Sequence, residues 1–159
     1  PYDYDGNGEK TCDIAVLIIY SDEQIKQMRE AAASESRKLI VNTEMNTQEL
    51  QKYDQLIIAG EYSVCLLDPT LYERVKSAGG FRKLSDVLGS VPETANDEYS
   101  IRFMDTEFAK YFGTFKDMPA DTLLCLRTQS VFGGKKADNK YDVSVSFFKN
   151  IVEFKAADQ

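Results

Sequence analysis

Histidine is absent from the 159-residue chain. Its absence excludes the Ser-His-Asp and Cys-His arrangements of nucleophilic enzymes, and it removes the commonest general base and the commonest transition-metal ligand. Carboxylate, lysine or Ser-Lys chemistry remains open, but the sequence contains no GxSxG, GxGxxG or GxxxxGK[ST] motif. We therefore predict no catalytic residues, no bound metal and no cofactor.

Basic residues are also few relative to acids. The chain has 19 Lys and Arg against 26 Asp and Glu, a formal net charge of −7 and an isoelectric point of about 4.7. This surplus of negative charge disfavours nucleic acid and anionic lipid surfaces as partners. A small basic cluster of Lys135, Lys136 and Lys140 lies beside Gly133 and Gly134, and we interpret it as a solvated loop.

Long hydrophobic runs are missing as well. The longest wholly apolar run covers residues 14–19, whereas a membrane-spanning helix needs about 20 apolar residues. No signal-peptide pattern is present, but the first residue is Pro1 rather than methionine. We therefore expect the sequence to be a piece of a longer protein, so the missing anchor says nothing about that parent protein.

Cysteine is scarce and dispersed. Cys12, Cys65 and Cys125 share no CxxC spacing, so the usual zinc and redox patterns are absent. Each lies within or beside an apolar run ("CDIAVLII", "SVCLL", "TLLCLR"), which predicts small, buried and unpaired side chains in strands. A disulfide between two neighbouring strands stays open as the alternative. A nucleophilic role is disfavoured because no histidine is available to activate a thiol.

The N-terminal segment "PYDYDGNGEK" is polar and rich in turn residues. It predicts a flexible acidic linker over residues 1–10. Asp3, Asp5, Asn7 and Gly8 occupy positions 1, 3, 5 and 6 of a calcium-binding loop, but position 12 is an isoleucine instead of an acid. The sequence leaves calcium binding by these residues open.

Apolar runs and amphipathic segments alternate along the rest of the chain. We predict strands near residues 13–19, 38–42, 62–67, 99–104 and 121–128. We predict helices over residues 21–36, 46–59, 69–78 and 140–157. Alternation of strands and helices is typical of an α/β fold. We therefore expect one domain over residues 11–157, with three layers: a mostly parallel central sheet and helices on both faces.

The stretch "GEYSVCLLDPTLYERVKSAGG" carries helix start and stop signals. We expect Asp68 to cap a helix and Pro69 to occupy its first position, where a missing N–H has no cost. Gly79 and Gly80 are expected to end that helix, and Gly60 to end the preceding one. These residue types are therefore explained by helix ends, and no ligand is needed to account for them.

Residues 50–88, "LQKYDQLIIAGEYSVCLLDPTLYERVKSAGGFRKLSDVL", resemble a segment common in extracellular solute-binding proteins. The matching features are the Ala-Gly-acid helix end at 59–61, the apolar strand at 64–67, Asp68, the Gly-Gly-Phe at 79–81, the Leu-Ser-Asp at 84–86 and the lead "IIYSDEQ" at 18–24. The resemblance implies one lobe of a periplasmic binding protein. It extends to bacterial proteins in which an N-terminal membrane segment precedes one such domain.

This resemblance implies a non-catalytic binding or interaction domain of a membrane-anchored bacterial protein, at the extracellular face of the cell membrane. Solute-binding proteins close two lobes around a ligand, whereas this chain has the length of one, so we do not expect a tight small-molecule ligand. We expect a protein or cell-envelope partner and no nucleic acid. The aromatic-rich segment 108–115, "FAKYFGTF", is the expected contact region.

Two alternatives remain. One is a small α/β enzyme that uses carboxylates such as Asp22 and Asp68. Tyr20, Ser21 and Asp22 follow the first predicted strand, where α/β folds place ligands, but we favour a helix-capping role for them over a pocket. The other is a receiver-like or flavodoxin-like signalling domain. Asp68 fits the end of the third predicted strand, but the paired acids and the lysine of receivers are not in register.

Overall fold

The structure, a computed structural model, describes residues 8, 14–34, 43–60, 62–129 and 134–156, without the side chains of 134–139. The described residues divide into two compact units. We call Asp13–Ala59 the helical unit, and Pro1–Cys12 with Gly60–Gln159 the sheet unit. Most of the predicted linker at 1–10 lies outside the described residues, so this boundary and the single domain over 11–157 stay predictions.

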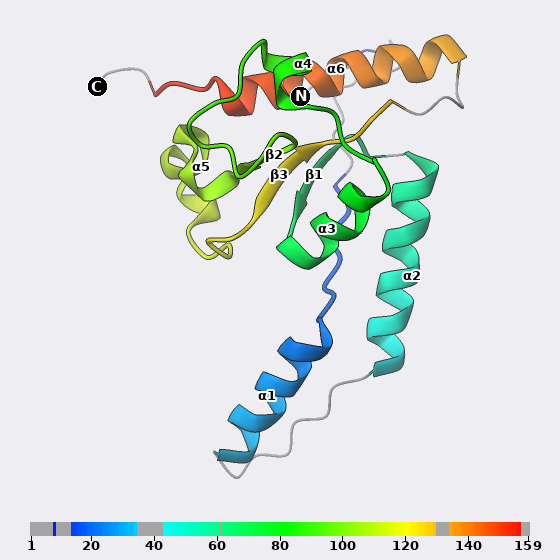
Figure 1. Cartoon of the computed structure of the whole chain (residues 1–159), viewed down its shortest axis with the longest axis vertical. Helices are drawn as coiled ribbons and strands as arrows, with labels where there is room; N and C mark the ends of the chain where they lie inside the picture. The colour runs from blue at the N-terminus through cyan, green and yellow to red at the C-terminus, as the bar shows by residue number, and fades with distance from the viewer. Residues whose placement is uncertain (1–7, 9–13, 35–42, 61, 130–133, 157–159) are drawn as a thin grey trace. The chain divides into compact units, whose positions relative to one another are not determined.

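A three-stranded antiparallel sheet lies at the centre of the sheet unit (Figure 1). It consists of β1 (Val64–Leu67), β2 (Ser100–Arg102) and β3 (Leu123–Leu126), in the order β1-β3-β2. β3 pairs antiparallel with both neighbours. The predicted three-layer α/β fold, with a mostly parallel sheet like that of a periplasmic binding protein lobe, is therefore wrong.

The positions of three strands were predicted correctly, and their directions were not. The segments at 62–67, 99–104 and 121–128 contain β1, β2 and β3. Every residue of β3 is buried because this strand is central. A fully buried strand has the continuous apolar composition that is typical of parallel sheets. Composition therefore located the strands, but it did not reveal that neighbouring strands run in opposite directions.

The apolar segment at 14–20 forms no strand in the described structure. Ile14, Val16 and Ile18 are 77%, 78% and 64% exposed, so the buried strand predicted at 13–19 is wrong. A strand requires a neighbouring strand that pairs with its backbone N–H and C=O groups, and the composition of one segment cannot supply that neighbour. The strand predicted at 38–42 lies outside the described residues.

Helices and 3-10 turns pack around the sheet. The sheet unit contains α3 (Pro69–Ser77), α4 (Leu84–Leu88), α5 (Glu107–Tyr111) and α6 (Gly134–Val152), with 3-10 turns η1 (Phe103–Asp105) and η2 (Gly113–Phe115). α6 starts at Gly134 rather than at residue 140, where the helix was predicted to begin. The loop predicted for "GGKKADN" is therefore helical from Gly134 onward.

The start of α3 follows the predicted pattern. The Asp68 carboxylate accepts hydrogen bonds from the backbone N–H groups of Thr70 and Leu71, at 2.8 and 3.2 Å. Pro69 occupies the first helical position. Two N–H groups that have no partner within the helix are thereby satisfied, which confirms Asp68 as the N-cap.

The end of α3 needs both glycines, for different reasons. Gly79 has a φ of +72°, a left-handed conformation that is unfavourable for residues with a Cβ. Its N–H donates to the Lys76 carbonyl, and the Gly80 N–H donates to the Val75 carbonyl, as in a Schellman motif. A Cβ on Gly80 would lie 2.4 Å from Val75 Cγ1. Gly79 is therefore needed for its left-handed backbone conformation, and Gly80 is needed because a side chain at this position would collide with Val75.

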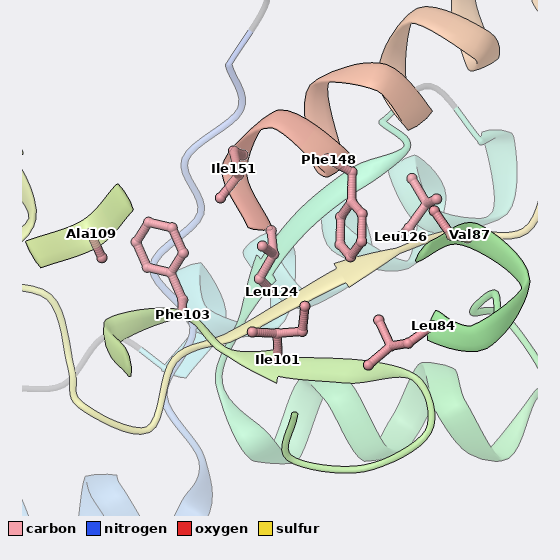
Figure 2. Packing of buried hydrophobic residues seen from close by; sticks show 9 residues of the cluster. All are labelled: Leu84, Val87, Ile101, Phe103, Ala109, Leu124, Leu126, Phe148 and Ile151. Atoms are coloured by element: carbon pink, nitrogen blue, oxygen red, sulfur yellow. The ribbon is translucent and has the colours of Figure 1, made fainter. Parts of the chain in front are cut away.

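The hydrophobic core of the sheet unit lies between the sheet, α4 and α6. Figure 2 shows Phe148 and Ile151 of α6 pointing toward Ile101 of β2 and Leu124 of β3. The buried residues of this core cluster are Leu84, Val87, Ile101, Phe103, Ala109, Leu124, Leu126, Phe148 and Ile151. Because Ala109 belongs to this cluster, the core also fixes the position of α5.

The helical unit contains α1 (Asp22–Ser34) and α2 (Thr43–Ala59), which confirm the helices predicted at 21–36 and 46–59. Ser21 Oγ accepts from the Gln24 N–H, and Gln24 Oε1 accepts from the Ser21 N–H, so the pair forms a capping box. Gly60, with a φ of +72°, follows α2 as predicted. In the described part of the chain, we find no helix with the length and hydropathy that a membrane span requires.

Candidate interaction surface

Six aromatic side chains form a continuous cluster around α5. Its members are Phe103, Phe108, Tyr111, Phe112, Phe115 and Phe154. The predicted contact segment 108–115 supplies all of them except Phe103 of η1 and Phe154, which follows α6. α5 contacts α6 in the fold (Figure 1). The tertiary structure therefore brings three separate parts of the sequence into one aromatic cluster.

Thr106 fixes the start of α5. Its Oγ1 donates to the Phe103 carbonyl at 2.7 Å and accepts from the Ala109 N–H at 3.2 Å. Thr106 and Ala109 are both buried. A five-residue helix has little stability of its own, so this cap and the core contact of Ala109 hold α5 in place and orient the rings that follow.

The rings pack in energetically favourable geometries. Phe103 and Phe115 lie 5.1 Å apart, centroid to centroid, at an interplanar angle of 89°. Phe108 and Phe154 lie 5.5 Å apart at 87°. Edge-to-face pairs of this kind contribute about 0.5–1.5 kcal/mol beyond the burial of their area. The inner part of the cluster is therefore a firm support for the rings on its outer side.

Exposure increases from the inner to the outer rings. Phe103 is 1% exposed, whereas Phe112 is 39% exposed and Tyr111 is 52% exposed. The Tyr111 ring lies 5.0 Å from Phe112 and 5.3 Å from the half-buried Phe154. We call Tyr111, Phe112 and Phe154 the aromatic surface. Neighbouring apolar rings at the solvent boundary are typical of interaction sites, whereas single exposed apolar residues are not.

Charged side chains of both signs border the aromatic surface. Glu107 and Lys110, on the same helix as Tyr111, form an exposed ion pair with an N–O distance of 3.7 Å. Lys155 directly follows Phe154 and is exposed. An apolar centre with a polar, charged border is the usual composition of a protein interface. The arrangement suits non-covalent contact with an apolar group on a partner.

A polar cluster lies around Asp97. Its carboxylate accepts hydrogen bonds from Tyr72 Oη at 2.7 Å, Lys76 Nζ at 2.8 Å and Ser100 Oγ at 2.9 Å. The backbone N–H groups of Tyr99 and Ser100 donate to it at 2.9 and 3.0 Å. We call this set the Asp97 cluster. It connects α3 to the start of β2.

The protonation states of the Asp97 cluster suit a structural role. Partial burial raises the pKa of Asp97, but the hydrogen bonds from Lys76, Tyr72 and Ser100 outweigh it and lower that pKa to about 2. Burial raises the pKa of the Tyr72 hydroxyl above its usual range. A carboxylate with such a low pKa is a weak base, and a tyrosine with such a high pKa is a weak acid. At neutral pH, Asp97 therefore stays ionised and Tyr72 stays protonated.

A shallow depression of about 510 Å³ lies between the end of α3 and the end of β3. Arg82, Lys83 and Tyr99 are among the residues that line it. The Lys83 ammonium is engaged by Glu98 at 2.8 Å and lies 5.8 Å from the centre of the Tyr99 ring. The depression is open to solvent, so it would leave much of a small ligand exposed, unlike a binding pocket that encloses one.

The carboxylates considered for catalysis have roles at helix starts. Asp68 caps α3, and Asp22 is an exposed residue in the first turn of α1. Ser21 caps α1, and the backbone N–H and C=O of Tyr20 both bond to the Asn46 side-chain amide, at 2.8 and 3.0 Å. Tyr20, Ser21 and Asp22 therefore have structural roles at the start of α1, and the contacts described for them bring no acid and base together.

Several predicted residues lie outside the described part of the chain. They are Asp3, Asp5 and Asn7 of the calcium-loop pattern, together with Cys12, Gly133 and the side chains of Lys135 and Lys136. Among the described residues, no group of three or more Cys, Asp or Glu side chains is placed to hold a metal ion. Lys140 is exposed, and Cys65 and Cys125 are buried free thiols, as predicted for these two.

The Asp97 cluster and two members of the aromatic cluster, Phe103 and Phe154, were not predicted from the sequence. Asp97 and Ser100 have the Asp-x-x-Ser spacing of a side-chain-capped turn, a local signal that was available. Tyr72 and Lys76 join them only through the tertiary structure, 25 and 21 residues away. Phe154 reaches α5 in the same way, so no local pattern could have predicted its contact.

Comparison of the chain with known protein families, curated proteins and solved structures gave no significant match.

Proposed function

We propose that this chain is a non-catalytic interaction domain that binds a protein or cell-envelope partner through the aromatic surface. The observation that supports the proposal is the exposure of Tyr111 and Phe112 on a cluster that is otherwise anchored in the core. Tyrosine and phenylalanine are enriched in protein interfaces, and aromatic anchors contribute a large share of binding energy.

Rigidity supports this choice of surface. Phe108 contacts Phe112 at 4.8 Å and Phe154 at 5.5 Å, so the outer rings rest on a ring that is itself packed against Phe103. Side chains that are held in place before binding lose less conformational entropy when a partner arrives. The aromatic surface therefore presents its apolar area at a low entropic cost.

A macromolecular partner suits the site better than a small molecule does. The aromatic surface is bordered by exposed charges, and the depression near Arg82 is open to solvent. Polar contacts in an open site compete with water, so each contributes little to affinity. A partner with a broad surface gains affinity instead by covering several rings at once.

The cellular location is part of the same proposal. We place the domain at the extracellular face of the cell membrane, in a membrane-anchored bacterial parent protein, because residues 50–88 resemble a segment of extracellular solute-binding proteins. We do not propose that the chain shares the fold of those proteins, because its sheet is antiparallel.

Binding to isolated bacterial envelopes tests the proposal. Fluorescently labelled chain is titrated with envelope fragments, and the bound fraction is measured after sedimentation. We expect saturable binding that weakens at least about tenfold in Tyr111→Ser/Phe112→Ser, because loss of one aromatic anchor typically costs 1–2 kcal/mol or more. Protease treatment of the envelopes distinguishes a protein partner from a wall polymer.

Val91→Ser is the matched control. Val91 is 52% exposed, the same fraction as Tyr111, and it lies outside the aromatic cluster. This variant should bind as the unaltered chain does. Equal binding by the double variant would exclude the aromatic surface as the contact. A soluble sugar, peptide or amino acid that binds the chain with micromolar affinity would contradict the proposal as a whole.

A further inference from the structure

Cys65 and Cys125 lie directly opposite each other on neighbouring antiparallel strands. They are register partners in the β1–β3 pair. Side chains at directly opposite positions point to the same face of a sheet, so the two thiols share one side of β1 and β3. That side is the one opposite the Leu124 side of the sheet, because side chains alternate along a strand. The fold thus pairs two cysteines that are 60 residues apart in sequence.

The backbone pattern identifies the type of this pair. The Arg127 N–H donates to the Ser63 carbonyl at 2.8 Å, and Ser63 and Arg127 lie two residues beyond Cys65 and Cys125. Since hydrogen-bonded pairs recur at every second residue, Cys65 and Cys125 also form a hydrogen-bonded pair, for which the Cα–Cα distance is about 5.5 Å. Disulfides span Cα–Cα distances of about 4.4–6.8 Å. The backbone is therefore compatible with a covalent link.

Burial protects both thiols once the chain has folded. Cys65 is 8% exposed and Cys125 is fully buried. Burial raises the pKa of Cys65 to about 11, although the charge of Arg127 opposes the shift, and burial also raises the pKa of Cys125. The thiolate is the reactive form, so both side chains exchange slowly in the native state. The link must therefore form before or during folding, and it is shielded afterwards.

Both thiols are free in this structure, and we propose that they form a cross-strand disulfide when the chain folds in an oxidising compartment. A thiolate of one cysteine attacks a sulfur of a small-molecule disulfide, which releases one thiol and leaves a mixed disulfide. The second cysteine then attacks the protein sulfur of that mixed disulfide and releases the second thiol. Overall, two protein thiols lose two protons and two electrons, and one small-molecule disulfide is reduced to two thiols.

The link would join the first edge strand to the central strand of the sheet. It closes a long loop, which restricts the unfolded chain strongly. Opposite Cβ atoms in a sheet lie about 4.5–5.5 Å apart, whereas a disulfide brings them to about 3.8 Å. β1 and β3 therefore have to approach slightly, and this strain reduces the stabilisation below the value for an unstrained loop closure.

Oxidative refolding of the whole chain tests the proposal. The reduced, denatured protein is refolded with oxidised and reduced glutathione, free thiols are blocked, and a protease digest is analysed without reduction. We expect a peptide pair joined through Cys65 and Cys125, together with a midpoint of thermal unfolding that is roughly 5–10 °C higher than that of the reduced protein.

Serine variants supply the controls. Cys12→Ser should retain both the joined peptides and the thermal shift, whereas Cys65→Ser and Cys125→Ser should lose both. The peptide map of the unaltered chain decides the question even when a variant fails to fold. Recovery of Cys65 and Cys125 as free thiols after oxidative refolding, or a dominant link from either one to Cys12, would overturn the proposal.

Discussion

Asp97 determines how the chain enters β2. Its carboxylate bonds to the side chains of Tyr72, Lys76 and Ser100, and these contacts tie the turn before β2 to α3. Tyr72 is almost completely buried, and its ring stacks on Phe81 at 5.3 Å. A buried hydroxyl needs a partner, and removing that partner leaves an uncompensated polar group. The stability of this region therefore depends on one ionised carboxylate.

Asp97→Asn should destabilise the chain at neutral pH. Because the pKa of Asp97 is lowered to about 2 in the folded state, its contribution is fully present above the unfolded pKa of about 4 and is lost as the pH falls toward 2. We expect a loss of about 1–2 kcal/mol in the free energy of unfolding at pH 7, allowing for solvent screening. Urea unfolding at pH 7, 5, 4 and 3 measures how this difference shrinks.

Glu98→Gln is the control for that measurement. Glu98 neighbours Asp97 and forms an exposed ion pair with Lys83 at 2.8 Å, and solvent screening makes the contribution of such a pair to stability small. Its effect should be small at every pH. A difference between Asp97→Asn and the unaltered chain that stays constant from pH 7 down to pH 3 would show that the carboxylate charge is not the source of the stability.

At the scale of elements, α3 shows how a short helix is defined at both ends. Its nine residues are bounded by the Asp68 cap and by the Gly79 and Gly80 turn. Tyr72 and Val75 are its buried residues. So short a helix gains most of its stability from caps and tertiary packing rather than from its own backbone bonds.

Asp68→Ala should lower stability by about 1 kcal/mol, because the backbone N–H groups of Thr70 and Leu71 lose their acceptor. The corresponding shift in thermal midpoint is about 2–4 °C for a chain of this size. Asp68→Asn keeps an acceptor oxygen and should retain most of the stability. Calorimetry of both variants checks the mechanism, and equal destabilisation by alanine and asparagine would argue against a capping bond.

At the scale of the whole molecule, the core belongs to one part of the chain. All nine residues of the hydrophobic cluster come from the sheet unit, between Leu84 and Ile151. In the described part of the helical unit, the buried hydrophobic side chains are Ile25 and Tyr53. Cooperative folding requires a shared apolar core, so the two units differ in their capacity to fold alone.

A fragment of residues 60–159 should fold by itself. It contains all three strands and the complete core cluster, so we expect a cooperative urea transition and a near-ultraviolet circular dichroism signal from its packed aromatic rings. A fragment of residues 13–59 is the comparison, and it should unfold without a sharp transition because isolated helices of this length are marginal in water. A broad, non-cooperative transition for 60–159 would contradict this division.

The sequence predicted local features well, including features of the candidate site. The Asp68 cap, the glycines that end α2 and α3, and the positions of β1, β2 and β3 all depend on neighbouring residues, whereas the strand predicted at 13–19 was wrong. The exposed rings Tyr111 and Phe112 lie in the aromatic segment that we identified as the contact region. Such features arise from side-chain and backbone contacts within a few residues, and a single sequence contains that information.

Only the tertiary structure decided which segments meet. Strand direction, the exposure of Ile14 and Val16, the position of Phe154 beside α5 and the pairing of Cys65 with Cys125 all depend on contacts between distant residues. An apolar run is stabilised by burial whatever covers it, because the hydrophobic effect has no direction. By itself the sequence therefore determined where helices end and which runs can be buried, while hydrogen-bond pairing and packing between distant segments determined the antiparallel sheet and the surfaces it presents.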